Sequence, residues 1–112
     1  MEINTTRETD FYIIHITGDL DASSCIALDK AIAEAAAGGE KKLLIDCTDL
    51  HYISSAGLGV FMSYLQDFEA QAISMTLYGV NTKVQKVFQI LGLDALINIV
   101  NNKEEAKQLA NG

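Results

Sequence analysis

The sequence predicts a single α/β domain with a mixed, mostly parallel β-sheet and about four helices. Segments rich in β-branched and aromatic residues alternate along the chain with segments whose apolar residues recur at helical spacing. The connections between these segments are short, and no repeat or low-complexity stretch interrupts them. The expected element order is ββαβαβαβα, in which strands joined through helices pair in parallel and the first two strands form an antiparallel edge.

The first half of the chain supplies two paired strands, a helix and a buried strand. Residues 11–17 are mainly β-branched or aromatic and stop before a glycine, and residues 2–6 are expected to pair with them as an edge strand. Residues 21–24 carry helix-start chemistry. Apolar residues follow at helical spacing up to a Gly-Gly stop: Cys25, Leu28, Ile32 and Ala35. Residues 43–45 are typical of a short strand buried on both faces.

The second half repeats the alternation. Residues 73–78 predict a strand with one polar-leaning face, and residues 97–100 a shorter strand. Asn81 or Thr82 is expected to cap the third helix, and residues 103–110 form a last, weak helix. Two apolar stripes define the second and third helices: Leu58, Phe61, Met62, Leu65 and Phe68, then Val84, Val87, Phe88 and Leu91.

Composition excludes several classes of protein. The chain has 112 residues, taken as one domain over 1–112, with 49% hydrophobic and 21% charged residues. A formal net charge of −7 disfavours direct nucleic-acid binding, and the absence of a long apolar run disfavours membrane insertion. No signal peptide is visible and the two cysteines make no disulfide scaffold, so we expect a cytoplasmic protein. The negative charge can be explained by solubility alone, or it can indicate a basic binding partner.

The sequence shows no motif for catalysis, metal binding or cofactor binding. The histidines and cysteines lack metal-ligand spacing: His15, Cys25, Cys47 and His51. We expect the two cysteines to be small buried hydrophobic residues, and His15 to be a packed or edge residue of a strand. The chain has neither a Gly-x-Ser-x-Gly elbow nor a phosphate-binding loop, so the prediction is not an enzyme and no cofactor.

The segment 46–60 is the most unusual one. It is expected to leave a strand, turn and enter a helix, which is where sites form in α/β sheets. A hydroxyl at a helix start is both a possible cap and an exposed group, so Ser55 could be either. Gly57 and Gly59 each cost about 1 kcal/mol in a helix, which suggests that the surface there must stay flat or that another backbone comes close.

Three stretches carry a family resemblance: "YISSAGLGVF", "TGDLD" at 17–21 and "LLIDCTDL" at 43–50. Together they resemble the STAS domain, and are most similar to the bacterial anti-sigma factor antagonists. The resemblance covers nearly the whole chain. It implies a single STAS domain and a regulatory binding protein.

The resemblance also implies a switch and its residues. In this family the unphosphorylated antagonist binds an anti-sigma factor that is also a serine kinase, which frees the sigma factor; phosphorylation ends the binding and a serine phosphatase restores it. The phosphorylated serine falls on Ser55 and the acidic pair of the first loop on Asp19 and Asp21. The family's aspartate is replaced by Ser54 and its second hydroxyl by Ala56, so Ser54 is an alternative acceptor or the helix cap.

The expected partner surface combines this helix start with the outer side of the helix, while Phe61, Met62 and Leu65 face the core. Its residues are Asp19, Asp21, Ser54, Ser55, Ala56, Gly57, Gly59, Val60 and Ser63. The alternative function is a STAS scaffold or accessory subunit of a stress-signalling complex or membrane transporter. A small enzyme is a third, weaker possibility, because no acid–base pair stands out.

Overall fold

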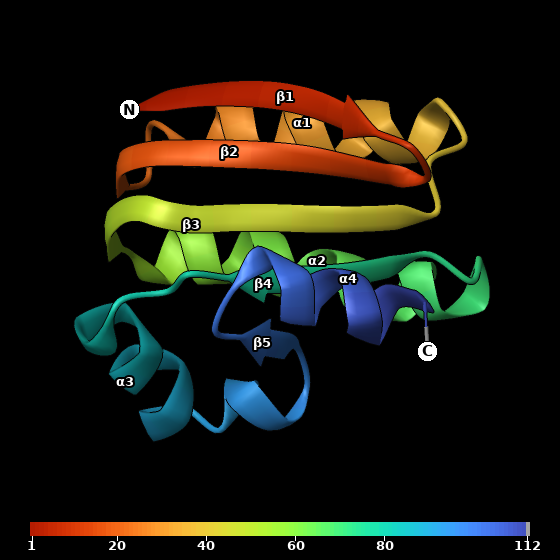
Figure 1. Ribbon diagram of the computed structural model, residues 1–112. Helices are drawn as coiled ribbons and strands as arrows, with labels where there is room; N and C mark the ends of the chain where they lie inside the picture. The colour runs from red at the N-terminus through yellow and green to blue at the C-terminus, as the bar shows by residue number, and fades with distance from the viewer. Residues whose placement is uncertain (112) are drawn as a thin grey trace.

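A computed structural model describes residues 1–111 as a five-stranded sheet with helices on both faces (Figure 1). The strands lie in chain order across the sheet: β1 (Glu2–Glu8), β2 (Phe11–Leu20), β3 (Lys42–Ile53), β4 (Ser74–Tyr78) and β5 (Asn98–Val100). The helices are α1 (Cys25–Ala37), α2 (Ser55–Ala70), α3 (Thr82–Ile90) and α4 (Lys103–Asn111), with a 3-10 turn η1 (Leu93–Ala95) before β5. β1 pairs antiparallel with β2 and all other pairs are parallel, as the sequence predicts.

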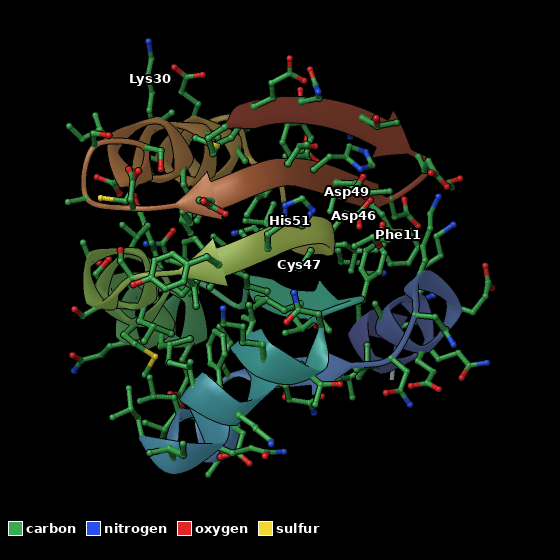
Figure 2. The ribbon with its side chains drawn as sticks, turned by 90° about the vertical axis from the view of Figure 1, so that its left-hand side faces the viewer. Phe11, Lys30, Asp46, Cys47, Asp49 and His51 are labelled. Carbon is green, nitrogen blue, oxygen red and sulfur yellow. The ribbon has the colours of Figure 1, made fainter. Side chains whose placement is uncertain are left out.

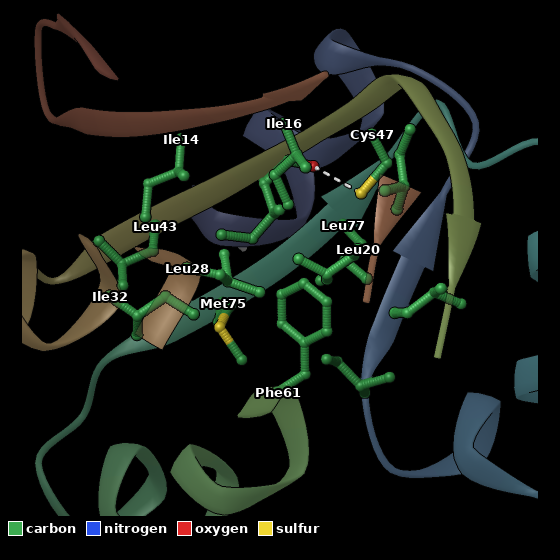
Figure 3. Close-up of a cluster of buried hydrophobic side chains, with 14 of the residues drawn as sticks. Ile14, Ile16, Leu20, Leu28, Ile32, Leu43, Cys47, Phe61, Met75 and Leu77 are labelled. Atoms are coloured by element: carbon green, nitrogen blue, oxygen red, sulfur yellow. Dashed lines mark hydrogen bonds between the residues drawn. The ribbon is translucent and has the colours of Figure 1, made fainter. Parts of the chain in front are cut away.

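The main core lies between the sheet and helices α1, α2 and α3. Figure 3 shows its centre, where Phe61 of α2 and Leu28 of α1 meet side chains from the strands. These side chains are fully buried, and burying each one contributes about 1.5–3 kcal/mol. The opposite face of the sheet has a smaller core under α4, formed by Phe11, Ile13, Leu44, Tyr78 and Ala106.

β2 and β3 are longer than the sequence predicts. The expected end of β2 before Gly18 and the expected turn after residue 45 are both wrong: β2 runs to Leu20 and β3 to Ile53. The pairing register shifts between Gly18 and Asp19, and Gly18 adopts φ 102° there, so a bulge carries the strands onward. The segment that follows Ile45 is therefore a strand up to the start of α2.

β4 is buried on both faces, so the prediction of a polar-leaning face is wrong. Thr76, which would lie on that face, is fully buried, and Tyr78 is 6% exposed. The reason is α4, which packs over this part of the sheet. Among residues 1–111, the Thr76 hydroxyl is the buried side-chain oxygen left without a hydrogen-bond partner.

Five side chains predicted in the core are partly or mainly exposed, among them Val87 of α3, which is half-buried and packs against the main core. Met62 and Leu65 are half-buried, because they flank the inward stripe of α2. Leu91 is 57% exposed, since it follows the last residue of α3 where the chain turns away at Gly92. Cys25, the first residue of α1, is half-buried. Within residues 1–111, no helix is both long and apolar enough to cross a lipid bilayer.

Candidate functional site

The carboxyl ends of β2 and β3 meet the start of α2. The two strands stay paired to Leu20 and Ile53, and the Ser54 N–H donates to the Leu20 carbonyl at 2.8 Å. Asp19 and Asp21 flank Leu20 and are exposed. The bulged extension of both strands thus brings the predicted acidic pair beside the start of the predicted switch helix.

The two serines at this helix start have different environments. Ser54 is the N-cap, with extended backbone, and its Oγ accepts from the Gly57 N–H at 3.2 Å. It is half-buried, whereas Ser55, the first residue of the helix, is exposed. Of the two roles open to Ser54, the structure shows the capping role, and the accessible hydroxyl belongs to Ser55.

Asp21 holds the turn that leads into α1. Its Oδ1 accepts from the backbone N–H of Ser24 at 2.9 Å and of Ser23 at 3.1 Å, and from both serine hydroxyls. The Ser24 N–H, followed by the two hydroxyls, lowers the pKa of Asp21 to about 2. Asp21 is therefore a turn residue that precedes the N-cap of α1, which is Ser24, and it is an ionised exposed carboxylate.

The outer side of α2 carries small residues. Ala56, Gly59 and Ser63 are exposed in line with Ser55, and a Cβ added to Gly59 would meet no atom within 4 Å. The Ser63 hydroxyl donates to the Val60 carbonyl at 2.7 Å, which turns it back onto the helix. This side of the helix is consequently low in relief and open to close approach.

Two residues predicted on that outer side face inward. Gly57 is buried, and an added Cβ would lie 2.9 Å from Leu20 Cγ and 3.0 Å from Ile53 Cγ1. Val60 is half-buried and packs against the main core. Gly57 is thus a glycine because the first turn of α2 lies directly on the strand ends, and the exposed strip consists of Ser55, Ala56, Gly59 and Ser63.

Tyr52 belongs to this surface and was missed by sequence reasoning. It is 46% exposed and pairs in register with Asp19 across β2 and β3. Assigning residues 46–53 to a turn hid the pairing that places it there. Tyrosines are enriched among the residues that contribute most to protein–protein binding.

A second polar cluster crosses three strands near the middle of the sheet. His15 Nδ1 lies 2.7 Å from Asp46 Oδ2, and its Nε2 lies 3.1 Å from the Thr6 hydroxyl. Asp46 Oδ1 accepts from the Thr48 N–H at 3.0 Å and from its hydroxyl at 2.6 Å. Burial raises the pKa of Asp46, but the bonds from Thr48 and His15 outweigh it, so the net shift is downward.

This cluster links side chains of neighbouring strands on one face of the sheet. Figure 2 shows its Asp46 on β3, with Asp49 and His51 at later positions of the same strand. Thr6, His15 and Asp46 place a hydroxyl, an imidazole and a carboxylate in series across the strands, and His15 is half-buried within a strand, which suits the packed role predicted for it. No group of three or more metal-binding side chains occurs in the described part of the chain.

The cysteines differ from each other. Cys47 is fully buried, as predicted, and its thiol faces the Ile45 carbonyl at 3.7 Å (Figure 3). Burial raises the pKa of the Cys47 thiol strongly, followed by the nearby Asp46 charge. Cys25 is half-buried at the head of α1, and its thiol donates to the Ala22 carbonyl at 3.1 Å.

Comparisons with known proteins converge on one family. The model of the STAS domain matches residues 2–106. The anti-sigma-B factor antagonist of Listeria monocytogenes is 29% identical over 99 residues, covering 88% of this chain and 87% of the relative. The crystal structure of an anti-sigma factor antagonist from Mycobacterium paratuberculosis has a TM-score of 0.90 at 15% identity, covering 99% and 94%. The phosphorylated form of the Bacillus cell fate determinant SpoIIAA has a TM-score of 0.73 at 21% identity, covering 96% and 99%.

Proposed function

This chain belongs to the STAS domain family, and from that premise we propose that it is an anti-sigma factor antagonist switched by phosphorylation of Ser55. In the unphosphorylated form it binds an anti-sigma factor that is a serine kinase, and the sigma factor is released. Transfer of a phosphoryl group to Ser55 ends the binding, and a serine phosphatase restores it. A sigma factor works on chromosomal DNA, so the proposal places the protein in the cytoplasm.

The observation that carries the proposal is the accessible hydroxyl of Ser55 beside two exposed carboxylates. The neighbouring hydroxyl of Ser54 is half-buried and engaged as the cap, so a kinase would reach Ser55 more readily. The names of the relatives point the same way: the Listeria relative is named for antagonism of an anti-sigma factor, and SpoIIAA has a phosphorylated form.

The chemistry of the helix start supports a switch that acts at the surface. A phosphate brings about −1.5 to −2 charges, which the free N–H groups of a helix N-terminus stabilise. Phosphorylation of Ser55 should therefore leave the fold intact. It adds bulk and negative charge next to Asp19 and Asp21, where a partner has to pack, and a partner surface complementary to these carboxylates is basic.

The deciding experiment is phosphate mapping. The protein is incubated with ATP and a candidate anti-sigma factor serine kinase, and the product is analysed by mass spectrometry. We expect phosphate on Ser55 in the wild type and in Ser54→Ala, and no phosphate in Ser55→Ala. Ser54→Ala should lose about 1 kcal/mol of stability, because it removes the helix cap. Phosphate on Ser54 would overturn the site, and none at all would favour the scaffold function.

Binding provides the second test. Ser55→Asp should keep the wild-type thermal transition while its affinity for the kinase falls. Gly59→Arg should behave in the same way, because the site of Gly59 is open and exposed. Gln108→Arg, on an exposed position of α4 on the opposite face of the sheet, is the matched control and should bind normally. Unchanged affinity of Gly59→Arg would move the interface away from α2.

A further inference from the structure

β1 is a long, open sheet edge. The strand order leaves β1 and β5 at the two edges. β5 has only three residues, between η1 and α4, whereas β1 has seven, paired with β2 without a register shift. In Figure 1, α1 lies behind β1 and the outer edge of the strand carries no other described element. One row of backbone N–H and C=O groups of β1 thus faces outward.

The residues of β1 do not protect this edge. Soluble proteins usually block an edge strand with proline, a bulge or charges in mid-strand. The chain contains no proline, and β1 has no bulge. Its middle residues, Asn4, Thr5 and Thr6, are exposed and uncharged, and the charged residues stand only toward its ends. An unprotected edge strand of this kind can pair with a strand of another chain.

We propose that β1 pairs antiparallel with β1 of a second copy of this chain, so that two five-stranded sheets form one continuous sheet. A two-fold axis at Thr5 places Thr5 opposite itself, Asn4 opposite Thr6 and Glu2 opposite Glu8. An axis perpendicular to the sheet keeps equivalent faces on the same side, as antiparallel pairing requires. All seven residues of β1 then take part in the ladder.

Charge favours this register. Glu8 is held by two lysines of α4, an ion pair with Lys103 and a contact of 2.9 Å with Lys107. Lys103 and Lys107 carry two positive charges and Glu8 carries one negative charge, so the group has a net charge of +1. Glu2 of the second copy, opposite Glu8, supplies the missing negative charge, and the two-fold axis repeats the arrangement at the other end. The strand therefore complements itself in charge as well as in length.

Oligomeric mass tests the pairing. Sedimentation of the full chain from low micromolar to several hundred micromolar concentration should show a monomer–dimer equilibrium. Thr5→Lys sets two lysines opposite each other at the axis and should raise the dimer dissociation constant at least about fivefold. Gln89→Lys, which adds the same charge on an exposed residue of α3, away from β1, should leave it unchanged. A monomer at every concentration, or a dimer unaffected by Thr5→Lys, overturns the proposal.

A disulfide trap tests the register. In a Cys25→Ser background, Thr5→Cys should give a covalent dimer on mild oxidation with diamide, because residues directly opposite in an antiparallel pair have Cα atoms within disulfide reach. Thr17→Cys in the same background should stay monomeric. Equal crosslinking of the two variants would show random collision and overturn the assigned contact. Circular dichroism of each variant establishes that it is folded.

Discussion

Alanine substitutions at Gly57 and Gly59 measure how tightly α2 lies on the strand ends. A Cβ at Gly57 would meet Leu20 Cγ and Cδ2 at 2.9 Å, and Leu20 is fully buried, so it has no solvent to move into. Such overpacking costs about 1–3 kcal/mol. Alanine also gains about 1 kcal/mol over glycine in a helix. We therefore expect Gly57→Ala to lose up to about 2 kcal/mol of stability.

Gly59→Ala is the matched control on the same helix. Its Cβ would meet nothing within 4 Å, so only the helix-propensity gain remains and the protein should become more stable by about 0.5–1 kcal/mol. The assay is urea unfolding followed by circular dichroism. The difference between the two variants isolates the packing cost. Equal changes in stability would mean that Leu20 and Ile53 repack freely, which would refute the account of Gly57.

Two further predictions concern ionisation and thiol chemistry. The folded pKa of Asp21, about 2, lies below its unfolded value near 4, so its stabilisation is present above about pH 4 and is lost as pH falls toward 2; urea unfolding should therefore show a steeper loss of stability over this range in wild type than in Asp21→Asn. In a thiol-labelling assay with an aromatic disulfide reagent, Cys25 should react in the native state and Cys47 only after unfolding; two fast thiols would contradict the burial of Cys47.

The element order and most of the core could be predicted from periodicity, because the core-facing stripes of α1 and α2 are regular. The lengths of β2 and β3 could not. Gly18 looks like a strand stop in sequence, and only the pairing between the two strands shows that it sits in a bulge. The wrong prediction for Thr76 also arose from a contact between distant parts of the chain. Its polarity predicted a solvent-facing side of β4, but α4 covers that side.

Of the residues predicted on the outer side of α2, some are exposed as expected and others are not. Ser55, Ala56, Gly59 and Ser63 are exposed, whereas Gly57 and Val60 are turned inward. The sequence holds no direct signal for this difference, because a glycine that avoids a clash and a glycine that admits a partner look identical. Distinguishing them required the position of Leu20, which the bulge in β2 fixes.

In the first turns of α2, the residues that stabilise the helix differ from those of the proposed partner surface. Ser54 caps the helix, because its Oγ accepts a hydrogen bond from the Gly57 N–H. Gly57 has no side chain and therefore leaves room for the strand ends against the first turn. Ser55 and Gly59 take part in neither contact, and they are the exposed residues of the same turns. A phosphate on Ser55 can then change what binds without weakening what holds the helix. The Ser54 hydroxyl oxygen is already engaged as the cap and half-buried, whereas the Ser55 hydroxyl is exposed, so the proposed modification of Ser55 leaves the cap in place.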